Sequence, residues 1–280
     1  MSDPIRSPSP RVAAVQMVTG TDPSANLLQA EQLIREAAED GAELVVLPES
    51  FAFMGRRDRD LLGLRERDGE GRLQGFLSDV ARRYGLWLVG GTIPLDARDG
   101  ERVRAACLLF DEHGERVARY DKIHLFDVAV PDSSEHYRES ATIEPGEEIV
   151  VIDSPFGRLG LAVCYDLRFP EMFRQMLDRG LELLAVPAAF TATTGKAHWE
   201  VLVRCRAIEN LTYLITAGQG GRHANGRETF GHSMIVDPWG SVLVQAPCGE
   251  ASIGCALDKD FQISLRRDFP VLEHRSLKSG

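Results

Sequence analysis

Cysteine is scarce in this sequence, and long apolar runs are missing. The five Cys residues are an odd number, and none of them forms a Cys-x-x-Cys pair. This pattern argues against a zinc cluster or a disulfide framework and is typical of reduced thiols in a cytoplasmic protein. The longest apolar stretches, such as residues 181–190, have the length of a strand and are too short to span a membrane.

Positive charge is also in deficit. Lys and Arg total 32 against 42 Asp and Glu, which gives a net charge of −10 and a pI of about 5.3. An acidic surface disfavours nucleic acid or an anionic membrane as the main partner. Only four of the 32 basic residues are Lys, and the first of them is Lys122. Because Arg supplies most of the positive charge of this chain, we expect each Lys to have a specific role.

Linker-like and low-complexity segments are absent from residues 11–275, which predicts a single domain there. Residues 1–10 are rich in Ser and Pro and lack the apolar core of a secretory signal, so we expect a short disordered tail. Hydrophobic periodicity predicts alternating strands and helices, which indicates the α/β class. The expected strands cover residues 11–17, 44–47, 86–93, 102–110, 115–120, 149–152, 158–163, 181–186, 213–217, 233–236, 242–245 and 254–257. The expected helices cover residues 27–40, 73–84, 170–177, 198–209 and 259–269.

Cys164 lies where the buried strand 158–163 gives way to a helix that opens at Pro170. A thiol at such a turn can project outward and feel the partial positive charge of a helix N-terminus, which favours the thiolate. The alternative is a small buried Cys that packs as a hydrophobe, the commoner fate of this residue.

Glu49 and Lys122 are the next two candidates for chemistry. Glu49 follows the apolar strand 44–47, at the carboxyl end where open α/β sheets place their ligands. Burial there would raise its pKa and suit it to general-base work, whereas the alternative is a loop residue that caps the next element. Lys122 precedes an apolar-rich segment and could hold an oxyanion. Its alternative is a surface ion pair with Asp121 or Asp127.

Glu139 lies in an irregular segment, and taken alone it is a solvated loop charge. Together, however, Glu49, Lys122, Glu139 and Cys164 resemble the pattern of the nitrilase, or carbon–nitrogen hydrolase, superfamily. The resemblance covers residues 11–275, which would form one carbon–nitrogen hydrolase domain. The segments that carry it are residues 47–49, 120–127, 137–140, 163–171, 195–200, 206–210 and 231–240.

The resemblance implies a single-domain, four-layer α-β-β-α sandwich and a homodimer or higher homo-oligomer. It also implies a Cys164 nucleophile with Glu49 as the base that serves it. Lys122 and the backbone N–H of Tyr165 would stabilise the oxyanion, and Glu139 would orient Lys122 or the leaving group. Neither a cofactor nor a metal is implied.

Within the superfamily the chain looks most like the Nit branch of amidases, which act on small carboxylate-bearing amides. Residues 188–195, 219–223 and 226–229 lean towards hydrolysis of deaminated glutathione. The alternative is an ω-amidase activity on 2-oxoglutaramate or 2-oxosuccinamate.

Substrate contacts are expected from residues near the nucleophile and after the strand 181–186. Arg168 and Arg222 are candidates for clamps on a substrate carboxylate, and for each the alternative is an ordinary salt bridge. A further set could line the pocket: Phe190, Thr191 and Thr194. Four more residues could belong to the site wall or simply support the fold: Lys196, His198, Trp199 and His232.

Four other interpretations compete with this one. A Cys–His hydrolase would take its base from His124, His198 or His232. A metal enzyme is poorly supported because the His and Cys residues lack ligand spacing. A nucleotide-binding module of the Rossmann type would need a Gly-rich fingerprint, which this sequence does not contain. A catalytically silent scaffold is less consistent with four filled reactive positions.

Overall fold

The structure is a computed structural model that describes residues 9–129 and 136–277. The expected N-terminal tail, residues 1–10, lies mostly outside the described residues. The end of that segment is held in place, because the backbone oxygen of Pro10 accepts a hydrogen bond from the N–H of Leu257 at 2.9 Å.

Two sheets form the centre of the fold, and each combines parallel and antiparallel strands. In the first, β1, β2 and β3 run parallel, and the remaining pairs are antiparallel. Within the described residues this sheet has seven strands in the order β15 (Ala251–Ala256), β1 (Arg11–Gln16), β2 (Leu44–Val46), β3 (Trp87–Val89), β5 (Val103–Phe110) and β4 (Ile93–Asp96), with β6 (Arg116–Asp121) also paired to β5.

The second sheet repeats this plan, with β10, β11 and β12 parallel and the strands outside them antiparallel. Its order is β14 (Val242–Gln245), β13 (Met234–Val236), β12 (Tyr213–Gly218), β11 (Leu183–Ala188), β10 (Gly157–Leu161) and β9 (Val150–Ser154). A separate short hairpin consists of β7 (Asp127–Ala129) and β8 (His136–Arg138).

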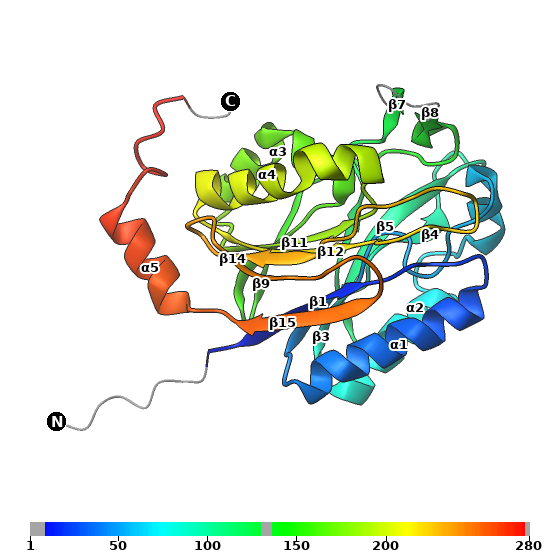
Figure 1. The fold of residues 1–280 in the computed structure, drawn as a ribbon, viewed down its shortest axis with the longest axis horizontal. Helices are drawn as coiled ribbons and strands as arrows, with labels where there is room; N and C mark the ends of the chain where they lie inside the picture. The colour runs from blue at the N-terminus through cyan, green and yellow to red at the C-terminus, as the bar shows by residue number, and fades with distance from the viewer. Residues whose placement is uncertain (1–8, 130–135, 278–280) are drawn as a thin grey trace.

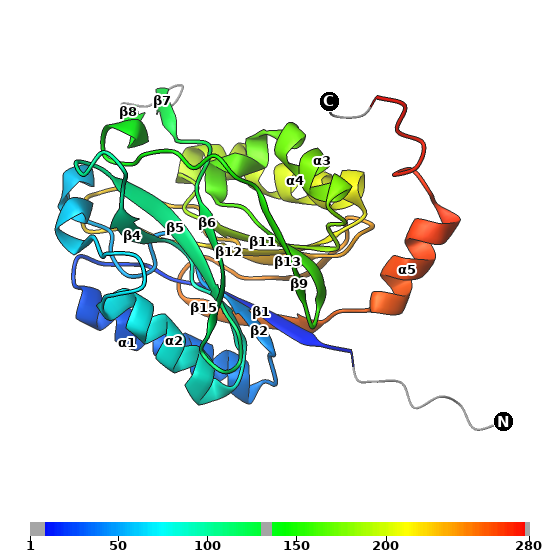
Figure 2. The ribbon, with the colours of Figure 1, turned by 180° about the vertical axis from the view of Figure 1, so that it is seen from behind.

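Helices cover the outer face of each sheet, so the chain forms the predicted four layers of helix, sheet, sheet and helix (Figure 1). The layer on the first sheet contains α1 (Pro23–Glu39) and α2 (Arg72–Tyr84), and the layer on the second contains α3 (Pro170–Asp178) and α4 (Ala192–Asn210). The helix α5 (Lys259–Asp268) follows β15 and lies at the end of the sandwich, as Figure 2 shows from behind. The predicted fold class is confirmed.

Side-chain alternation along β1 explains why both faces of this sheet are covered. Val12 and Ala14 face the second sheet, whereas Ala13 and Val15 face the helices α1 and α2. All four side chains are buried. A strand that is apolar on both faces must be covered on both, which requires a second sheet on one side and helices on the other.

One predicted strand is wrong in a way that matters for the site. Residues 86–93 form two strands, β3 and β4, which are separated at Gly90-Gly91. Gly91 has φ of +58°, and a Cβ there would lie 2.2 Å from the backbone oxygen of Pro48. The chain can therefore turn against the segment that leads to Glu49 only because this position is glycine.

Two helices begin earlier than their hydrophobic periodicity predicts. The N-cap of α1 is Asp22, whose side chain accepts from the N–H of Ser24, and that of α4 is Thr191, whose side chain accepts from the N–H of Thr194. Their first turns carry few apolar side chains, so periodicity misses them while capping reveals them. In the described residues, no helix has both the length and the apolar character needed to cross a bilayer.

Candidate active site

Strand ends from both sheets meet at one pocket of about 130 Å³. Glu49 follows β2, Lys122 follows β6, Cys164 follows β10, and Ala189 follows β11. Glu139 joins them from the short 3-10 helix η2 (Glu139–Ala141). Parallel strands place their carboxyl ends on one edge, and here the edges of two facing sheets supply the groups together.

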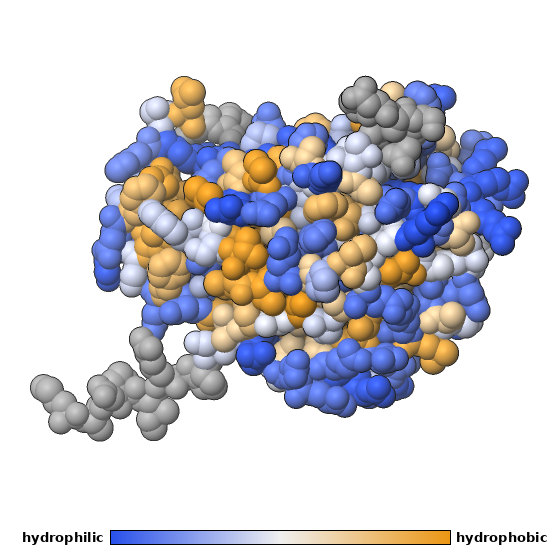
Figure 3. Space-filling model, viewed as in Figure 1, coloured by the Kyte–Doolittle hydropathy of each residue, from blue (hydrophilic) through white to orange (hydrophobic). Residues whose placement is uncertain are grey.

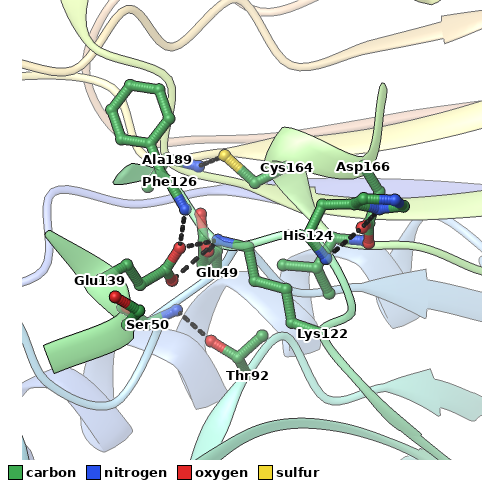
Figure 4. Close-up of polar contacts among 12 residues, drawn as sticks. Glu49, Ser50, Thr92, Lys122, His124, Phe126, Glu139, Cys164, Asp166 and Ala189 are labelled. Atoms are coloured by element: carbon green, nitrogen blue, oxygen red, sulfur yellow. Dashed lines mark hydrogen bonds and ion pairs between the residues drawn. The ribbon is translucent and has the colours of Figure 1, made fainter. Parts of the chain in front are cut away.

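Lys122 is the centre of this site, and its ammonium lies between two carboxylates (Figure 4). Its Nζ donates to Oε1 of Glu49 at 2.8 Å and to the two oxygens of Glu139 at 2.8 and 2.9 Å. The side chain is 2% exposed. The alternative of a surface pair with Asp121 or Asp127 is therefore wrong, and Asp121 pairs with Arg119 instead.

The charges of this cluster determine its protonation. Burial alone would lower the pKa of Lys122, but Glu139 and Glu49 raise that pKa well above its ordinary value, so the ammonium persists. Burial raises the pKa of Glu49, yet the Lys122 ammonium outweighs it and the net pKa is lowered. The expectation of a raised pKa for Glu49 is thus wrong. The pKa of Glu139 is raised, first by burial and then by the charge of Glu49.

Cys164 begins the 3-10 helix η3 (Cys164–Arg168) with φ of +50°, a left-handed conformation that is strained for a residue with a side chain. Its Sγ accepts a hydrogen bond from the N–H of Ala189 at 3.5 Å. Burial, followed by the charge of Glu49, raises the pKa of the Cys164 thiol well above its ordinary value. The expectation that a helix N-terminus favours the thiolate is wrong, because α3 begins only at Pro170 and a carboxylate adjoins the thiol.

Glu49 is the group placed to receive the proton of that thiol. Both residues line the same pocket, and after burial and the Lys122 ammonium the Cys164 side chain also contributes to the pKa of Glu49, which it lowers. The backbone around Glu49 is held on both sides: its oxygen accepts from Nε2 of Gln219 at 3.0 Å, and the N–H of Ser50 donates to Oγ1 of Thr92 at 2.8 Å. Ser50 has φ of +57°, a second strained position beside a reactive side chain.

A smaller cavity of about 30 Å³ adjoins the main pocket. Glu49 and Glu139 line both cavities, whereas Lys122 and Cys164 line only the larger one. Ser50 and Thr92 lie on this side of the cluster, away from Cys164 (Figure 4). The volume is enough for about two water molecules next to the Glu49 carboxylate.

Arg168 lines the main pocket, as predicted, and forms no ordinary salt bridge. Its guanidinium lies over the rings of Tyr165 and Phe190, at 5.7 and 5.2 Å from their centroids. Its Nη1 lies 3.2 Å from Nδ1 of His198, which must act as the acceptor because guanidinium only donates. No acidic side chain in residues 9–129 and 136–277 pairs with Arg168.

The second predicted clamp, Arg222, is not among the residues that line the pocket. Its side chain is exposed, and its backbone forms a bridge with that of Glu228. The turn between them carries Arg227 into the pocket instead. Nη2 of Arg227 donates to the oxygen of Ala189 at 2.7 Å, and its guanidinium lies 5.0 Å from the centroid of the Tyr137 ring. Its buried Nε has no hydrogen-bond partner in the described chain.

Phe190, Thr191 and Thr194 line the pocket, as predicted. The four residues considered for the site wall do not line it. Lys196 and His198 are exposed, and Trp199 is buried and donates through Nε1 to the backbone oxygen of His232 at 2.7 Å. Sequence reasoning missed several lining residues. Six of them lie between β2 and the end of the 3-10 helix η1 (Asp58–Leu64): Phe53, Met54, Gly55, Arg57, Asp58 and Leu61.

Histidine is absent from the described lining of this pocket. His124 faces Asp166, whose Oδ1 lies 2.7 Å from its Nδ1, and His198 contacts Arg168. The geometry therefore favours Glu49 over a histidine as the partner of Cys164. Among the described residues, no group of three or more His, Cys, Asp and Glu is arranged to hold a metal ion.

Comparison with known proteins decides the family. A model described as carbon–nitrogen hydrolase matches residues 11–258. This chain belongs to the carbon–nitrogen hydrolase family. It is 42% identical, over 96% of its length and 94% of the relative, to a deaminated glutathione amidase from Yersinia enterocolitica.

Solved structures agree with this assignment to the carbon–nitrogen hydrolases. Saccharomyces cerevisiae Nit3, a member of branch 10 of the nitrilase superfamily, aligns with a TM-score of 0.86 at 31% identity, covering 99% of this chain and all of Nit3. A mutant amidase from Nesterenkonia sp. AN1 shows Michael addition of acrylamide at its active-site cysteine. It aligns with a TM-score of 0.75 at 28% identity, covering 94% of this chain and 99% of the amidase.

The carbon–nitrogen hydrolase assignment excludes the alternative of a Rossmann-type nucleotide-binding module. That fold has one open sheet, whereas this chain packs two sheets face to face, with β1 against β12. The chain is thus an enzyme of the class that hydrolyses C–N bonds in amides.

Proposed function

We propose that this carbon–nitrogen hydrolase cleaves a carboxylate-bearing amide through a thioester on Cys164, with deaminated glutathione as its substrate. One observation carries the chemistry: the buried Lys122 ammonium contacts two carboxylates, one of which adjoins the Cys164 thiol. The choice of substrate rests on the deaminated glutathione amidase from Yersinia enterocolitica, which is 42% identical over nearly the whole chain. The alternative remains an ω-amidase acting on 2-oxoglutaramate or 2-oxosuccinamate.

The proposed reaction has two halves. Cys164 Sγ attacks the amide carbon while its proton passes to Glu49, and Glu49 then protonates the amine as the C–N bond breaks. A thioester remains on Cys164. Glu49 next takes a proton from water, whose oxygen attacks the thioester carbon. The C–S bond then breaks, Glu49 returns the proton to Sγ of Cys164, and the carboxylic acid is released.

Stabilisation of the oxyanion falls to Lys122 and the N–H of Tyr165. The Lys122 ammonium has three protons and three carboxylate contacts. An oxyanion must therefore replace one of these contacts, which makes Lys122 bind the tetrahedral intermediate in competition with Glu139 or Glu49. Glu139, with two of the three contacts, is proposed to orient Lys122 rather than to exchange protons with the substrate.

The charge of the pocket supports an anionic substrate. The described lining contains five cationic and three anionic side chains, although the whole chain carries −10. Two of these cations, Arg168 and Arg227, have no acidic partner in the described residues. Deaminated glutathione carries two carboxylates, one on the acyl group and one on the leaving group, and 2-oxoglutaramate carries only the first.

The decisive assay compares these two amides. Both present the same 2-oxoglutaryl group to Cys164, so the leaving group alone distinguishes them. We expect kcat/KM for deaminated glutathione to exceed that for 2-oxoglutaramate by about 10-fold or more, because one further charged hydrogen bond contributes about 1.5–3 kcal/mol. Cysteinylglycine and ammonia would be quantified separately. A preference for the ammonia-releasing substrate would reverse the assignment in favour of ω-amidase.

The two pocket arginines give a second test of substrate binding. Replacing Arg168 or Arg227 by Gln is expected to lower kcat/KM for deaminated glutathione by about 10- to 100-fold, mainly through KM. If one of these variants keeps the wild-type kcat/KM for 2-oxoglutaramate, the arginine that it lacks is the one that binds the carboxylate of the leaving group. Arg222→Gln is the matched control and should change kcat/KM by less than about 2-fold, because Arg222 is exposed and outside the pocket lining. Equal effects of all three changes would contradict this role.

We further propose a homodimer or higher homo-oligomer that works in the cytoplasm in metabolite repair. Apolar side chains gather over α4, β14 and α5 on the face in Figure 3. Exposed members of this surface include Val201, Ile208, Trp239, Leu243, Ile263 and Phe269. Large exposed apolar surfaces commonly mark interfaces, and a second copy fits the resemblance described above. The cytoplasmic assignment is supported by five free cysteines.

A further inference from the structure

Asp166 is a fully buried carboxylate with no part in the reaction described so far. It lies in η3, two residues after Cys164, and it is absent from the described lining of both cavities. Its side chain is 0% exposed. A buried carboxylate is costly unless every oxygen is satisfied, so the partners of Asp166 indicate what it is there to hold.

Four donors converge on this carboxylate. Oδ2 accepts from the hydroxyl of Tyr120 at 2.6 Å and from the N–H of Val163 at 2.7 Å. Oδ1 accepts from the N–H of His124 at 3.1 Å and lies 2.7 Å from Nδ1 of the same residue. The imidazole is fixed in turn by stacking on Phe169, at 3.7 Å between centroids and 7° between planes.

These donors belong to two segments that are distant in sequence. Tyr120 and His124 lie two residues before and two residues after Lys122, whereas Val163 directly precedes Cys164. One carboxylate therefore connects the backbone on both sides of the proposed oxyanion cation to the turn that carries the proposed nucleophile. Figure 4 shows Asp166 and His124 on the side of Lys122 away from Glu139.

The turn needs such support because Cys164 has φ of +50°. A strained residue persists only where its surroundings over-determine it. The hydrogen bonds of Asp166 to Val163, through the side chain at 2.7 Å and through the backbone N–H at 3.0 Å, fix the residue immediately before Cys164. Lys122 is fixed independently, through its own N–H to the oxygen of Ala105 at 3.0 Å.

We propose that Asp166 is a positioning residue that sets the separation of the Lys122 ammonium and the Cys164 thiol. It does so by joining the two backbone segments, without touching substrate. This inference rests on the proposed roles of Lys122 and Cys164, and it adds a residue that those roles do not require by themselves.

Asp166→Asn is the direct test, because it keeps the volume of the side chain but replaces one accepting oxygen by an NH₂ group. That NH₂ group is a donor, so it cannot accept the hydrogen bonds that the carboxylate oxygen accepts. We expect kcat for deaminated glutathione to fall by about 100-fold, which is the loss that a displacement of about 1 Å can cause, with KM within about 3-fold. The rate of Cys164 alkylation by iodoacetamide, followed by peptide mass spectrometry, should change as well. Peptide resolution is needed because two other cysteines, Cys205 and Cys248, are exposed and will react as well.

Tyr120→Phe tests the same connection if the Asn variant does not fold. It removes a single hydroxyl, and we expect kcat to fall by about 10-fold with KM unchanged. Tyr213→Phe is the matched control: Tyr213 is also buried, and its hydroxyl donates to the oxygen of Asp258 at 2.9 Å, at the opposite end of β12 from the site. It should cost comparable thermal stability while kcat stays within about 2-fold of wild type.

The outcomes separate this inference from the proposed function. If the wild-type enzyme does not cleave deaminated glutathione, the proposed substrate is wrong. The rate of Cys164 alkylation in wild type and variants still tests whether Asp166 positions the thiol. Active wild-type enzyme, together with equal kcat and equal Cys164 alkylation in Tyr120→Phe and Tyr213→Phe, overturns the positioning role. In that case Asp166 only stabilises the fold.

Discussion

Amide hydrolysis is expected to disappear when Cys164 is replaced by Ala. A thioester needs a thiol, and Cys164 is the only cysteine in the described lining of the pocket. Removal of the nucleophile in comparable covalent hydrolases costs about 10⁶-fold in kcat, and we expect a loss of that order. Cys164→Ser should be nearly as inactive, since the less acidic hydroxyl must give its proton to a carboxylate whose pKa is lowered.

Controls for this change must show that the enzyme is intact. Cys248→Ala is the matched variant, because Cys248 is exposed and its Sγ donates a weak hydrogen bond to the backbone oxygen of Gly220 at 3.7 Å. It should retain wild-type kcat. Analytical ultracentrifugation should give the same oligomeric state for wild type and both variants, and the proposal predicts a dimer or larger assembly. Appreciable turnover by the purified Cys164→Ala variant would show that Cys164 is not the nucleophile.

Lys122→Arg is expected to give the second largest effect although it conserves the charge. The pocket holds a compact ammonium whose three protons reach two carboxylates, all within 2.9 Å, and the Lys122 side chain is 2% exposed. A planar guanidinium is larger and presents its donors in a fixed fork, so it cannot reach Glu49, Glu139 and an oxyanion in the same way. We expect kcat to fall by about 10²–10³-fold, as on removal of one oxyanion donor.

Lys259→Arg provides the comparison for Lys122→Arg. Lys259 is also shielded from solvent in part; it donates to the backbone oxygen of Phe156 at 2.8 Å and lies 3.6 Å from Glu182, far from the pocket. It should keep kcat within about 2-fold of wild type. Steady-state kinetics at a temperature below the unfolding midpoint of each variant would measure both changes. A near-normal kcat for Lys122→Arg would refute the oxyanion role.

Two of the proposed reactive groups lie at places that the sequence makes recognisable, whereas Lys122 and Glu139 were assigned from the resemblance to the nitrilase superfamily. Glu49 follows an apolar strand and Pro48, and Cys164 follows another strand and precedes Pro170-Glu171. Strand ends of this kind are local features, and local pattern predicts them well. The start of α4 at Ala192 was missed because a capping residue, Thr191, and not an apolar stripe, marks it.

The choice between Arg222 and Arg227 is one that local sequence pattern cannot predict. Arg222 and Arg227 belong to one short turn, and either could have faced the pocket. The backbone bridge between Arg222 and Glu228 decides the matter, because it leaves Arg222 at the surface and directs Arg227 inward. Asp166 is similar: its position two residues after Cys164 is visible in the sequence, but two of its partners, Tyr120 and His124, lie more than 40 positions away.

By itself the sequence determined which candidate side chains lie at strand ends and that the chain belongs to the α/β class, because residue type and short-range periodicity decide these properties. The four-layer sandwich and the grouping of Glu49, Lys122, Glu139 and Cys164 were predicted from the resemblance to the nitrilase superfamily. Only the tertiary structure decided the protonation of the site: Lys122 stays charged, the pKa of Cys164 is raised, and that of Glu49 is lowered. The physical reason is that Coulomb and desolvation energies depend on separations of a few ångström between segments as far apart as Glu49 and Lys122, 73 positions along the chain.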